Sequence, residues 1–232
     1  MSHTQQQDFC KLVDKNFFRE KKISILEIGS YNVNGTIRDI FVNQKYIGVD
    51  VKKGPCVDIV YDGQNLDIKD KFDLSISCEC FEHNPFYLEN FKKMIELTKN
   101  DGVVVFTCAS LFRKEHGTTR TTSADSPGSM EKWDYYKNLF KKDFEKKIDM
   151  NKTFYKYQFY YNLFSDDLYF IGIKNDNHLE NFKSFNHDVT QRFQNEISQH
   201  PISFYLLFFI FKKIFIKMQV KLTRILKKYQ NN

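Results

Sequence analysis

Short apolar runs alternate with polar and amphipathic segments along most of the chain. Five runs have the length and composition of buried strands: 23–28, 45–51, 58–61, 72–78 and 103–108. Between them, 87–97 has helical periodicity and 36–41 reads as a helix start. This alternation predicts an α/β fold with a doubly wound, mostly parallel sheet.

The flanking segments extend this picture. An amphipathic helix is expected near the N-terminus, and another helix is expected over 133–147. Runs at 154–164 and 168–173 read as two further strands, which gives a seven-stranded sheet whose last strand is antiparallel. We therefore expect four parts: an N-terminal helix (1–20), one globular domain (21–176), a linker (177–200) and a C-terminal amphipathic helix (201–232).

The composition indicates the size of the core and the cellular compartment. The 232 residues, 41% of them hydrophobic, suffice for one α/β core with an appendage. The five cysteines are odd in number and lack zinc-ligand spacing, so we expect a reducing compartment and no metal site. The first ten residues have no apolar signal core, which favours a cytoplasmic location.

Charge is unevenly distributed along the chain. The formal net charge is +6, but residues 201–232 contain seven Lys or Arg and no acidic residue. Residues 1–200 therefore hold 28 basic (35 − 7) and 29 acidic residues, a net charge of −1. A near-neutral body carries a strongly basic tail.

The tail combines this charge with an apolar helical face. On a helix, one face collects Phe211, Ile214, Phe215, Met218, Leu222, Ile225 and Leu226, and the opposite face collects the basic residues. The apolar run at 202–211 is too short to span a bilayer, which needs ~20 residues. We expect a helix on the anionic inner surface of the membrane; docking on the body or on another subunit is the alternative. Nucleic acid is a less favoured partner, because no aromatic platforms lie among the basic residues.

The sequence LEIGSYNVNG, residues 26–35, follows the first strand and has neither GxGxxG nor lysine. Glu27 stands just before Gly29, where a carboxylate repels phosphate but attracts an ammonium group. Asp50 ends the second strand, where doubly wound folds place an acid on ribose hydroxyls. A ligand with a ribose and a cation, such as S-adenosylmethionine, would bind both carboxylates. The alternative is that Glu27 is a surface acid and Asp50 a cap at the end of its strand.

Five segments in order resemble class I S-adenosylmethionine-dependent methyltransferases, from about Ile23 to Lys174. ILEIGSYNVNG resembles motif I, YIGVDV motif II and DIVYDGQNL motif III. FDLSISCECFEHNP resembles motif IV, and LTKNDGVVVFTC resembles the strand after it. Motif I departs from the usual ExGxGxG, because residues 30–34 replace its central glycines. The resemblance implies a Rossmann-like fold and S-adenosyl-L-methionine as cofactor.

The resemblance also implies the cofactor-binding residues. Glu27 and Gly29 would lie near the methionine end, Asp50 on the ribose, and Asp62 with Gly63 beside the adenine. The full expected set is Glu27, Gly29, Ser30, Gly35, Asp50, Val51, Asp62, Gly63, Cys78 and Glu79.

The polar segment 113–136 leaves the C-terminal end of the fifth strand, where open α/β sheets bind ligands. It resembles the corresponding loop of methyltransferases encoded with surface-polysaccharide genes, which implies a sugar-like acceptor; a solvated loop is the alternative. The expected substrate-binding residues are Arg113, Arg120, Asp125 and Tyr135. An alcohol acceptor gains from a base, for which His116 is the first candidate and His83 the second.

Three classes of function therefore compete. The favoured one is a methyltransferase acting on a small molecule or lipid-linked glycan at the membrane surface. The second is an RNA- or protein-directed methyltransferase whose tail grips the substrate. The third is a nucleotide-cofactor oxidoreductase or an inactive binding module on the same sheet.

Overall fold

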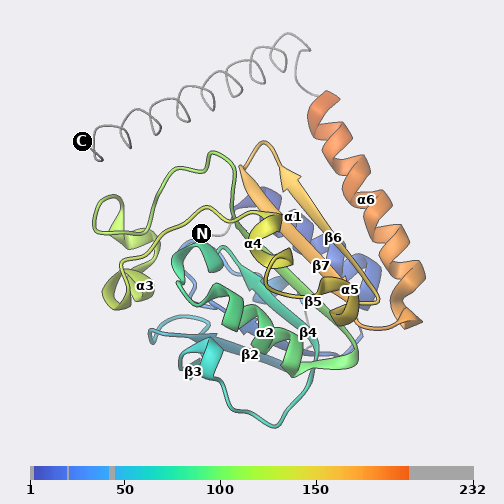
Figure 1. Ribbon diagram of the computed structural model, residues 1–232, viewed down its shortest axis with the longest axis horizontal. Coiled ribbons are helices and arrows are strands. Elements are labelled where there is room, and N and C mark those ends of the chain that lie inside the picture. Colours follow the sequence, from blue (N-terminus) through green and yellow to red (C-terminus); the bar gives the residue numbers. More distant parts are fainter. Residues whose placement is uncertain (1–2, 20, 42–44, 199–232) are drawn as a thin grey trace. The chain divides into compact units, whose positions relative to one another are not determined.

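The computed structural model describes residues 3–19, 21–41 and 45–198 (Figure 1). Their strands form one sheet in the order β3-β2-β1-β4-β5-β7-β6. The strands are β1 Ser24–Ile28, β2 Lys45–Asp50, β3 Ile59–Val60, β4 Phe72–Cys78, β5 Thr98–Ala109, β6 Lys156–Asn162 and β7 Asp167–Ile173. β7 is antiparallel to both neighbours, and every other pairing is parallel. The predicted fold class is confirmed.

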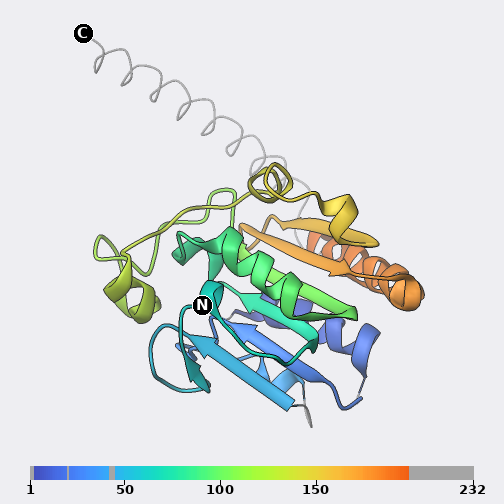
Figure 2. The ribbon, with the colours of Figure 1, turned by 60° about the horizontal axis from the view of Figure 1, so that its bottom comes forward.

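Helices cover both faces of the sheet (Figure 2). One face carries α1 (Thr4–Val13), its π-helical continuation Asp14–Phe18 and the start of α6 (Leu179–Ser198); the Phe9 and Phe185 rings of α1 and α6 are 5.4 Å apart. The other face carries α2 (Tyr87–Leu97), α4 (Lys141–Glu145) and α5 (Met150–Thr153). The remaining helix, α3 (Pro127–Lys132), belongs to the long segment after β5.

Side-chain alternation along the central strands explains why both faces need cover. Phe170 on β7 stacks on Phe106 of β5 at 4.9 Å, on the face that α2 closes through Phe91. The next side chain along β7, Tyr169, points the other way and lies 4.7 Å from Phe9 of α1. Since both faces bury large aromatic rings, β7 is buried along its whole length and carries apolar side chains on both sides.

Two expected helices are wrong. The segment 36–41 contains only a 3₁₀ turn, Arg38–Ile40, and helix is confined to Lys141–Glu145 within 133–147. The chain before α4 instead runs across the strand ends: the Lys137 N–H donates to the Glu82 carbonyl and the Leu139 N–H to the Ala109 carbonyl, both at 2.9 Å. These long-range hydrogen bonds replace the helical ones.

The expected linker, 177–200, is also different in the structure. Most of it is α6, and Phe182, Phe185 and Val189 are buried on the body. The apolar face of this helix therefore extends the core to Val189, the last residue of the compact unit 1–189. The expected helix at 201–232 lies outside the described residues. Among those that are described, no helix has the length and apolar character needed to cross a membrane.

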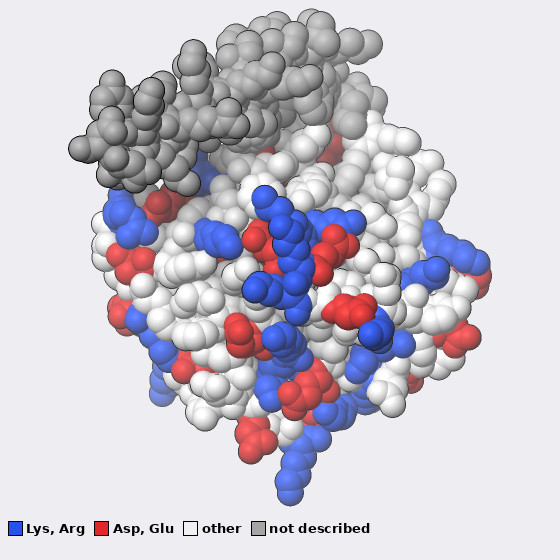
Figure 3. All heavy atoms as spheres, viewed as in Figure 1, with Lys and Arg blue, Asp and Glu red and all other residues white. Residues whose placement is uncertain are grey.

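The surface of the body matches its near-neutral charge. In the face shown in Figure 3, basic and acidic side chains are interspersed over the described part of the chain. Several form exposed ion pairs, such as Lys93 with Glu96 and Lys141 with Glu145. This face offers a partner no extended region of one sign of charge.

Candidate active site

The order of strands reverses between β1 and β4, and ligands of open α/β sheets bind at such a point, beyond the carboxyl ends of the strands. The loops leaving β1 and β4 meet closely here. Gly29 has φ +83°, and a Cβ on it would lie 2.4 Å from the Cβ of Cys80. Only glycine therefore allows this turn, which leaves backbone exposed to the crevice.

A cavity with about 880 Å³ of empty space, partly open to solvent, occupies this crevice. Nine of the ten expected cofactor residues line it: Glu27, Gly29, Ser30, Gly35, Asp50, Val51, Gly63, Cys78 and Glu79. The tenth, Asp62, is outside the wall, and its carboxylate pairs with Lys132.

Glu27 is a buried acid at the base of the cavity, with 4% of its surface exposed. Burial raises its pKa to about 8, although the hydroxyl of Tyr46 donates a 3.0 Å hydrogen bond to the carboxylate. A cationic group of a ligand would return the carboxylate to its charged form. The position fits an ammonium group and disfavours a phosphate.

Asp50 ends β2 with its carboxylate on the cavity wall. The backbone N–H groups of Tyr31 and Lys52 donate to its two oxygens, each at 3.2 Å. Burial raises the pKa of Asp50, and these backbone donors oppose the shift. The donors fix the carboxylate in place and leave acceptor capacity on both oxygens for hydroxyl groups.

The segment 125–133 covers the cavity next to Asp50. Residues that it adds to the wall are Asp125, Ser126, Pro127, Gly128, Ser129 and Trp133. A Cβ on Gly128 would lie 3.3 Å from the Asp50 carboxylate. Ion pairs of Lys52 with Glu131 and of Lys132 with Asp62 hold α3 to the loops after β2 and β3. We call residues 125–133 the cover segment.

Of the four expected substrate-binding residues, only Asp125 reaches the cavity wall. Arg113 instead donates to the Ser165 carbonyl at 2.7 Å. Arg120 pairs with Glu115 within its own loop. Tyr135 does not line the cavity, and the neighbouring Tyr136 is the ring that contacts the histidines.

The structure brings both candidate bases together, but only His83 lines the cavity. Its ring centroid is 4.8 Å from that of His116, which stands behind it. Burial, followed by the charge of His116, lowers the pKa of His83 well below its usual value, and burial also lowers that of His116. Both rings are therefore neutral at pH 7 and offer a lone pair. The geometry favours His83 over the first candidate, His116.

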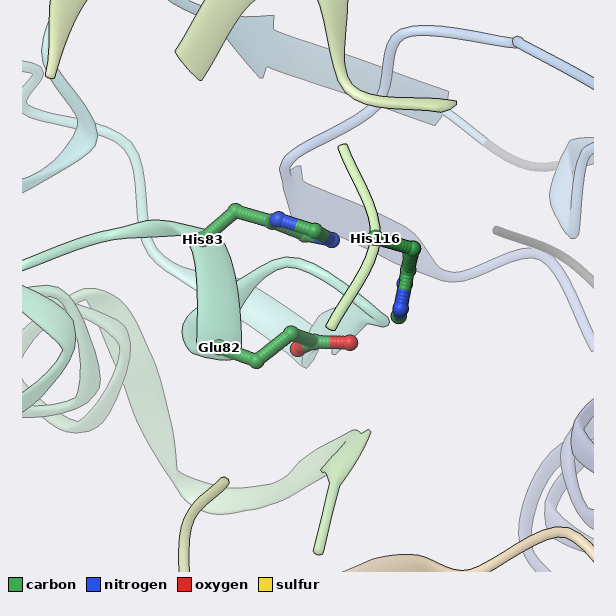
Figure 4. A group of neighbouring side chains, drawn as sticks. All are labelled: Glu82, His83 and His116. Carbon is green, nitrogen blue, oxygen red and sulfur yellow. The ribbon is translucent and has the colours of Figure 1, made fainter. Parts of the chain in front are cut away.

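Glu82 completes this cluster (Figure 4). The ligand atoms of Glu82, His83 and His116 all lie within 4.8 Å of one another. Burial, then the charge of Glu79, raises the pKa of Glu82 to about 8. The sequence predicted no metal site, because these residues come from two loops more than thirty positions apart.

A second polar cluster joins His3, Glu79 and Asp167. His3 Nε2 lies 2.9 Å from an Asp167 oxygen, and an Arg113 nitrogen lies 3.6 Å from the other oxygen. Burial lowers the pKa of His3, but the hydrogen bond to Asp167 and the charges of Glu79 and Asp167 outweigh it and raise the pKa. Glu79, at φ 49°, links this cluster to the cavity wall.

Several wall residues were not predicted from the sequence. They are Gln6, Tyr31, Val33, Tyr61, Cys80, Asn84 and residues 126–129. Ser126-Pro127 is one signal available in the sequence, since proline at the first helical position marks a helix start. Gln6 carries no such signal; it is a single polar residue on the buried side of α1.

Comparison with known proteins identifies the fold. No protein-family model matches the chain, and no curated protein is similar to it in sequence. The N-terminal domain of EvdMO1, solved in the presence of S-adenosylhomocysteine and D-fucose, matches with a TM-score of 0.52 and 13% identity over 75% of this chain and 85% of that one. The Burkholderia thailandensis 1,6-didemethyltoxoflavin-N1-methyltransferase, with bound 1,6-didemethyltoxoflavin and S-adenosylhomocysteine, matches at 0.51 and 12% over 74% and 79%. The chain therefore has a fold that is found in a methyltransferase.

Proposed function

We propose that this protein is an S-adenosylmethionine-dependent methyltransferase. The observation that carries the proposal is the cavity between β1 and β4, whose wall holds Glu27, Gly29, Asp50 and Gly63. The wall presents carboxylates where a phosphate-binding loop would present backbone N–H groups and a lysine. Both structural relatives were solved with S-adenosylhomocysteine.

The residues fit the parts of this cofactor. Asp50 would accept hydrogen bonds from the ribose hydroxyls, and Gly63 would lie beside the adenine. Glu27 and the backbone at Gly29 would hold the amino acid end. The cofactor supplies a methyl group on a sulfonium, and the chain has to hold the acceptor about 3–3.5 Å from that methyl, in line with the breaking bond.

We propose a sugar hydroxyl, free or lipid-linked, as the acceptor. His83 and the polar cover segment border the same cavity, and a neutral imidazole there suits an alcohol. The EvdMO1 domain was solved in the presence of D-fucose, which gives the sugar class further support. Mass spectrometry of candidate sugars after incubation with labelled cofactor tests this assignment; methylation of RNA or protein alone would replace it.

Cofactor binding is tested by isothermal titration of the full chain. S-adenosylmethionine and S-adenosylhomocysteine should bind with one site each, and NAD should not. Binding of NAD without S-adenosylmethionine would select the oxidoreductase. Binding of neither would indicate a module without this cofactor.

We also propose that the protein works in the cytoplasm, attached to the inner face of the membrane through residues 201–232. The sequence pattern supports this, with seven basic residues each contributing ~1 kcal/mol near anionic lipid and an apolar face beside them. Flotation with anionic liposomes should require the tail, and truncation after His200 should abolish it. A full chain that ignores such vesicles but retains RNA in a salt-sensitive way would contradict the proposal.

A further inference from the structure

Glu82, His83 and His116 form a compact set of buried ligand atoms. Glu82 and His83 are consecutive on the 3₁₀ turn Phe81–His83, and His116 comes from the loop after β5. Their exposed fractions are 0%, 3% and 8%. Figure 4 shows the carboxylate and the two rings turned toward one common space.

The Glu82 carboxylate is buried and has no side chain paired with it among the described residues. Within the described residues, neither of its oxygens has a hydrogen-bond partner, and no ion pair includes it. A buried carboxylate without a partner either keeps its proton, as the pKa of about 8 implies for Glu82, or binds a cation that stabilises the charged form. Both ring nitrogens of His83 and Nε2 of His116 are likewise unpartnered in the part of the chain that is described.

The His116 ring has the orientation that is typical of a metal ligand. Its Nδ1 lies 3.0 Å from the Lys114 carbonyl, so that nitrogen carries the proton and donates it. The lone pair is then on Nε2, which faces the cluster. A backbone carbonyl on the far ring nitrogen is a common way in which proteins orient a histidine toward a metal.

The neighbouring cluster of His3, Glu79 and Asp167 shows the contrast. There the His3 ring and the Arg113 guanidinium both lie near Asp167 and supply positive charge. Around Glu82, the described residues supply no cationic side chain in ion-pair contact. The two sets have similar ligand types, but among the described residues only the set around Asp167 has cationic side chains in ion-pair contact.

We propose that Glu82, His83 and His116 bind a divalent transition-metal ion at the edge of the cavity. Two imidazole nitrogens and one carboxylate suit Zn²⁺, Fe²⁺, Co²⁺ or Mn²⁺. Three protein ligands leave positions open, and His83 places them beside the cavity. With the ion bound, the two rings serve as metal ligands, and the ion takes the place of the neutral His83 imidazole in activating the alcohol.

The role of the ion rests on the proposed function. An acceptor hydroxyl bound to the ion would have a lower pKa and release its proton to water. Its oxygen would then form a bond to the methyl carbon while the carbon–sulfur bond breaks. The electron pair of that bond goes to sulfur and gives S-adenosylhomocysteine, so atoms and charge balance.

The test uses the full chain after treatment with a chelator and titration with Co²⁺, followed by visible absorption and calorimetry. We expect one site, with a spectrum of nitrogen and oxygen ligands. His116→Ala and Glu82→Gln should each weaken binding by at least ~100-fold, and His3→Ala should bind as the wild type does. Circular dichroism would show that each variant is folded, and Glu82→Gln keeps the side-chain size.

The outcomes separate this site from the proposed function. No binding to the wild type, unchanged binding by both His116→Ala and Glu82→Gln, loss of binding only in His3→Ala, or thiolate-to-cobalt absorption would each overturn the site. S-adenosylmethionine titration is run on the same samples without metal. Metal binding without cofactor binding would contradict the proposed function but leave the site standing.

Discussion

The two sides of the cavity are built in different ways. The wall formed by Glu27, Gly29 and Asp50 consists of strand ends and tight turns, held by the hydrogen bonds of the sheet. The cover segment contains a short helix held by exposed ion pairs and by an edge-on contact of Trp133 with Phe86, whose ring centroids are 6.0 Å apart. A wall made of strand ends is as rigid as the sheet, whereas a segment held by surface charges is only weakly fixed. The four predictions below test this difference.

The largest effect is expected from Gly29→Ala. The new Cβ would overlap Cys80 at 2.4 Å, and φ +83° is strained for alanine, by about 1–3 kcal/mol before the overlap is counted. Thermal unfolding should occur at a much lower temperature, and calorimetry should detect no cofactor binding.

Gly128→Ala is the matched change in the cover segment. Its Cβ would come within 3.0 Å of the Lys52 Cβ and 3.1 Å of the Val51 Cγ2, contacts that a shift of a few tenths of an ångström in the cover segment relieves, and alanine favours the helix. Stability should change by less than about 1 kcal/mol. Equal damage from both substitutions would remove the distinction between the two sides.

The second prediction concerns the pH dependence of stability. Glu27 has a pKa of about 8 in the folded protein against 4.5 as its reference value. Between these values the unfolded chain loses the proton first, so the contribution of Glu27 to stability is complete below pH 4.5 and is lost as pH rises toward 8. The upper limit of this loss is about 5 kcal/mol.

Urea unfolding of the wild type and of Glu27→Gln between pH 5 and 8.5 measures this loss of stability. The difference in free energy of unfolding between the two proteins should move in favour of the variant as pH rises. A constant difference would mean that Glu27 is ionised in the folded protein throughout.

The third prediction is that Asp50→Ala weakens S-adenosylmethionine binding by about 1–3 kcal/mol, because charged hydrogen bonds to the ribose are lost. The control is Asp70→Ala, which removes an exposed carboxylate paired with Lys45 far from the cavity wall. Calorimetry on folded proteins should separate the two. The same affinity for both variants would exclude Asp50 from the site.

The smallest effect is expected from Lys132→Met, which breaks the ion pair with Asp62. Exposed pairs contribute about 0–1 kcal/mol, so stability and cofactor affinity should change by no more than that. Lys141→Met, which breaks the pair with Glu145, is the control for charge alone. The threshold is a loss of about 2 kcal/mol in binding free energy, which is twice the largest contribution of such a pair. A greater loss of affinity would mean that the cover segment is a rigid wall.

The difference between the strand-end wall and the cover segment also explains which site residues could be predicted from the sequence. Glu27, Gly29 and Asp50 follow directly from where strands end, because the end of a parallel strand fixes its place at the sheet edge. The expected helix at 133–147 failed because hydrogen bonds to Glu82 and Ala109 decide that segment, and these partners are distant in sequence. Arg113 was misplaced for the same reason, since its partner Ser165 is 52 positions away. Arg120 instead pairs with Glu115 of its own loop, and this pair keeps it off the cavity wall.

The histidines illustrate an intermediate case. Both belong to the site region, as their positions after β4 and β5 indicated. Which of them borders the cavity depends on the turn at Phe81–His83 and on packing against Tyr136, and no periodicity encodes either. Their pairing with Glu82 is likewise a product of the assembled loops.

The ion pairs of Lys52 and Lys132 also have a consequence for kinetics. If the proposed cofactor lies beneath α3, any lifting of the cover segment during its release would break both pairs. Salt screens exposed charges, so rising ionic strength should shorten the residence time of S-adenosylhomocysteine more than it changes equilibrium affinity. If release of the product limits the proposed methyl transfer, turnover should rise with ionic strength.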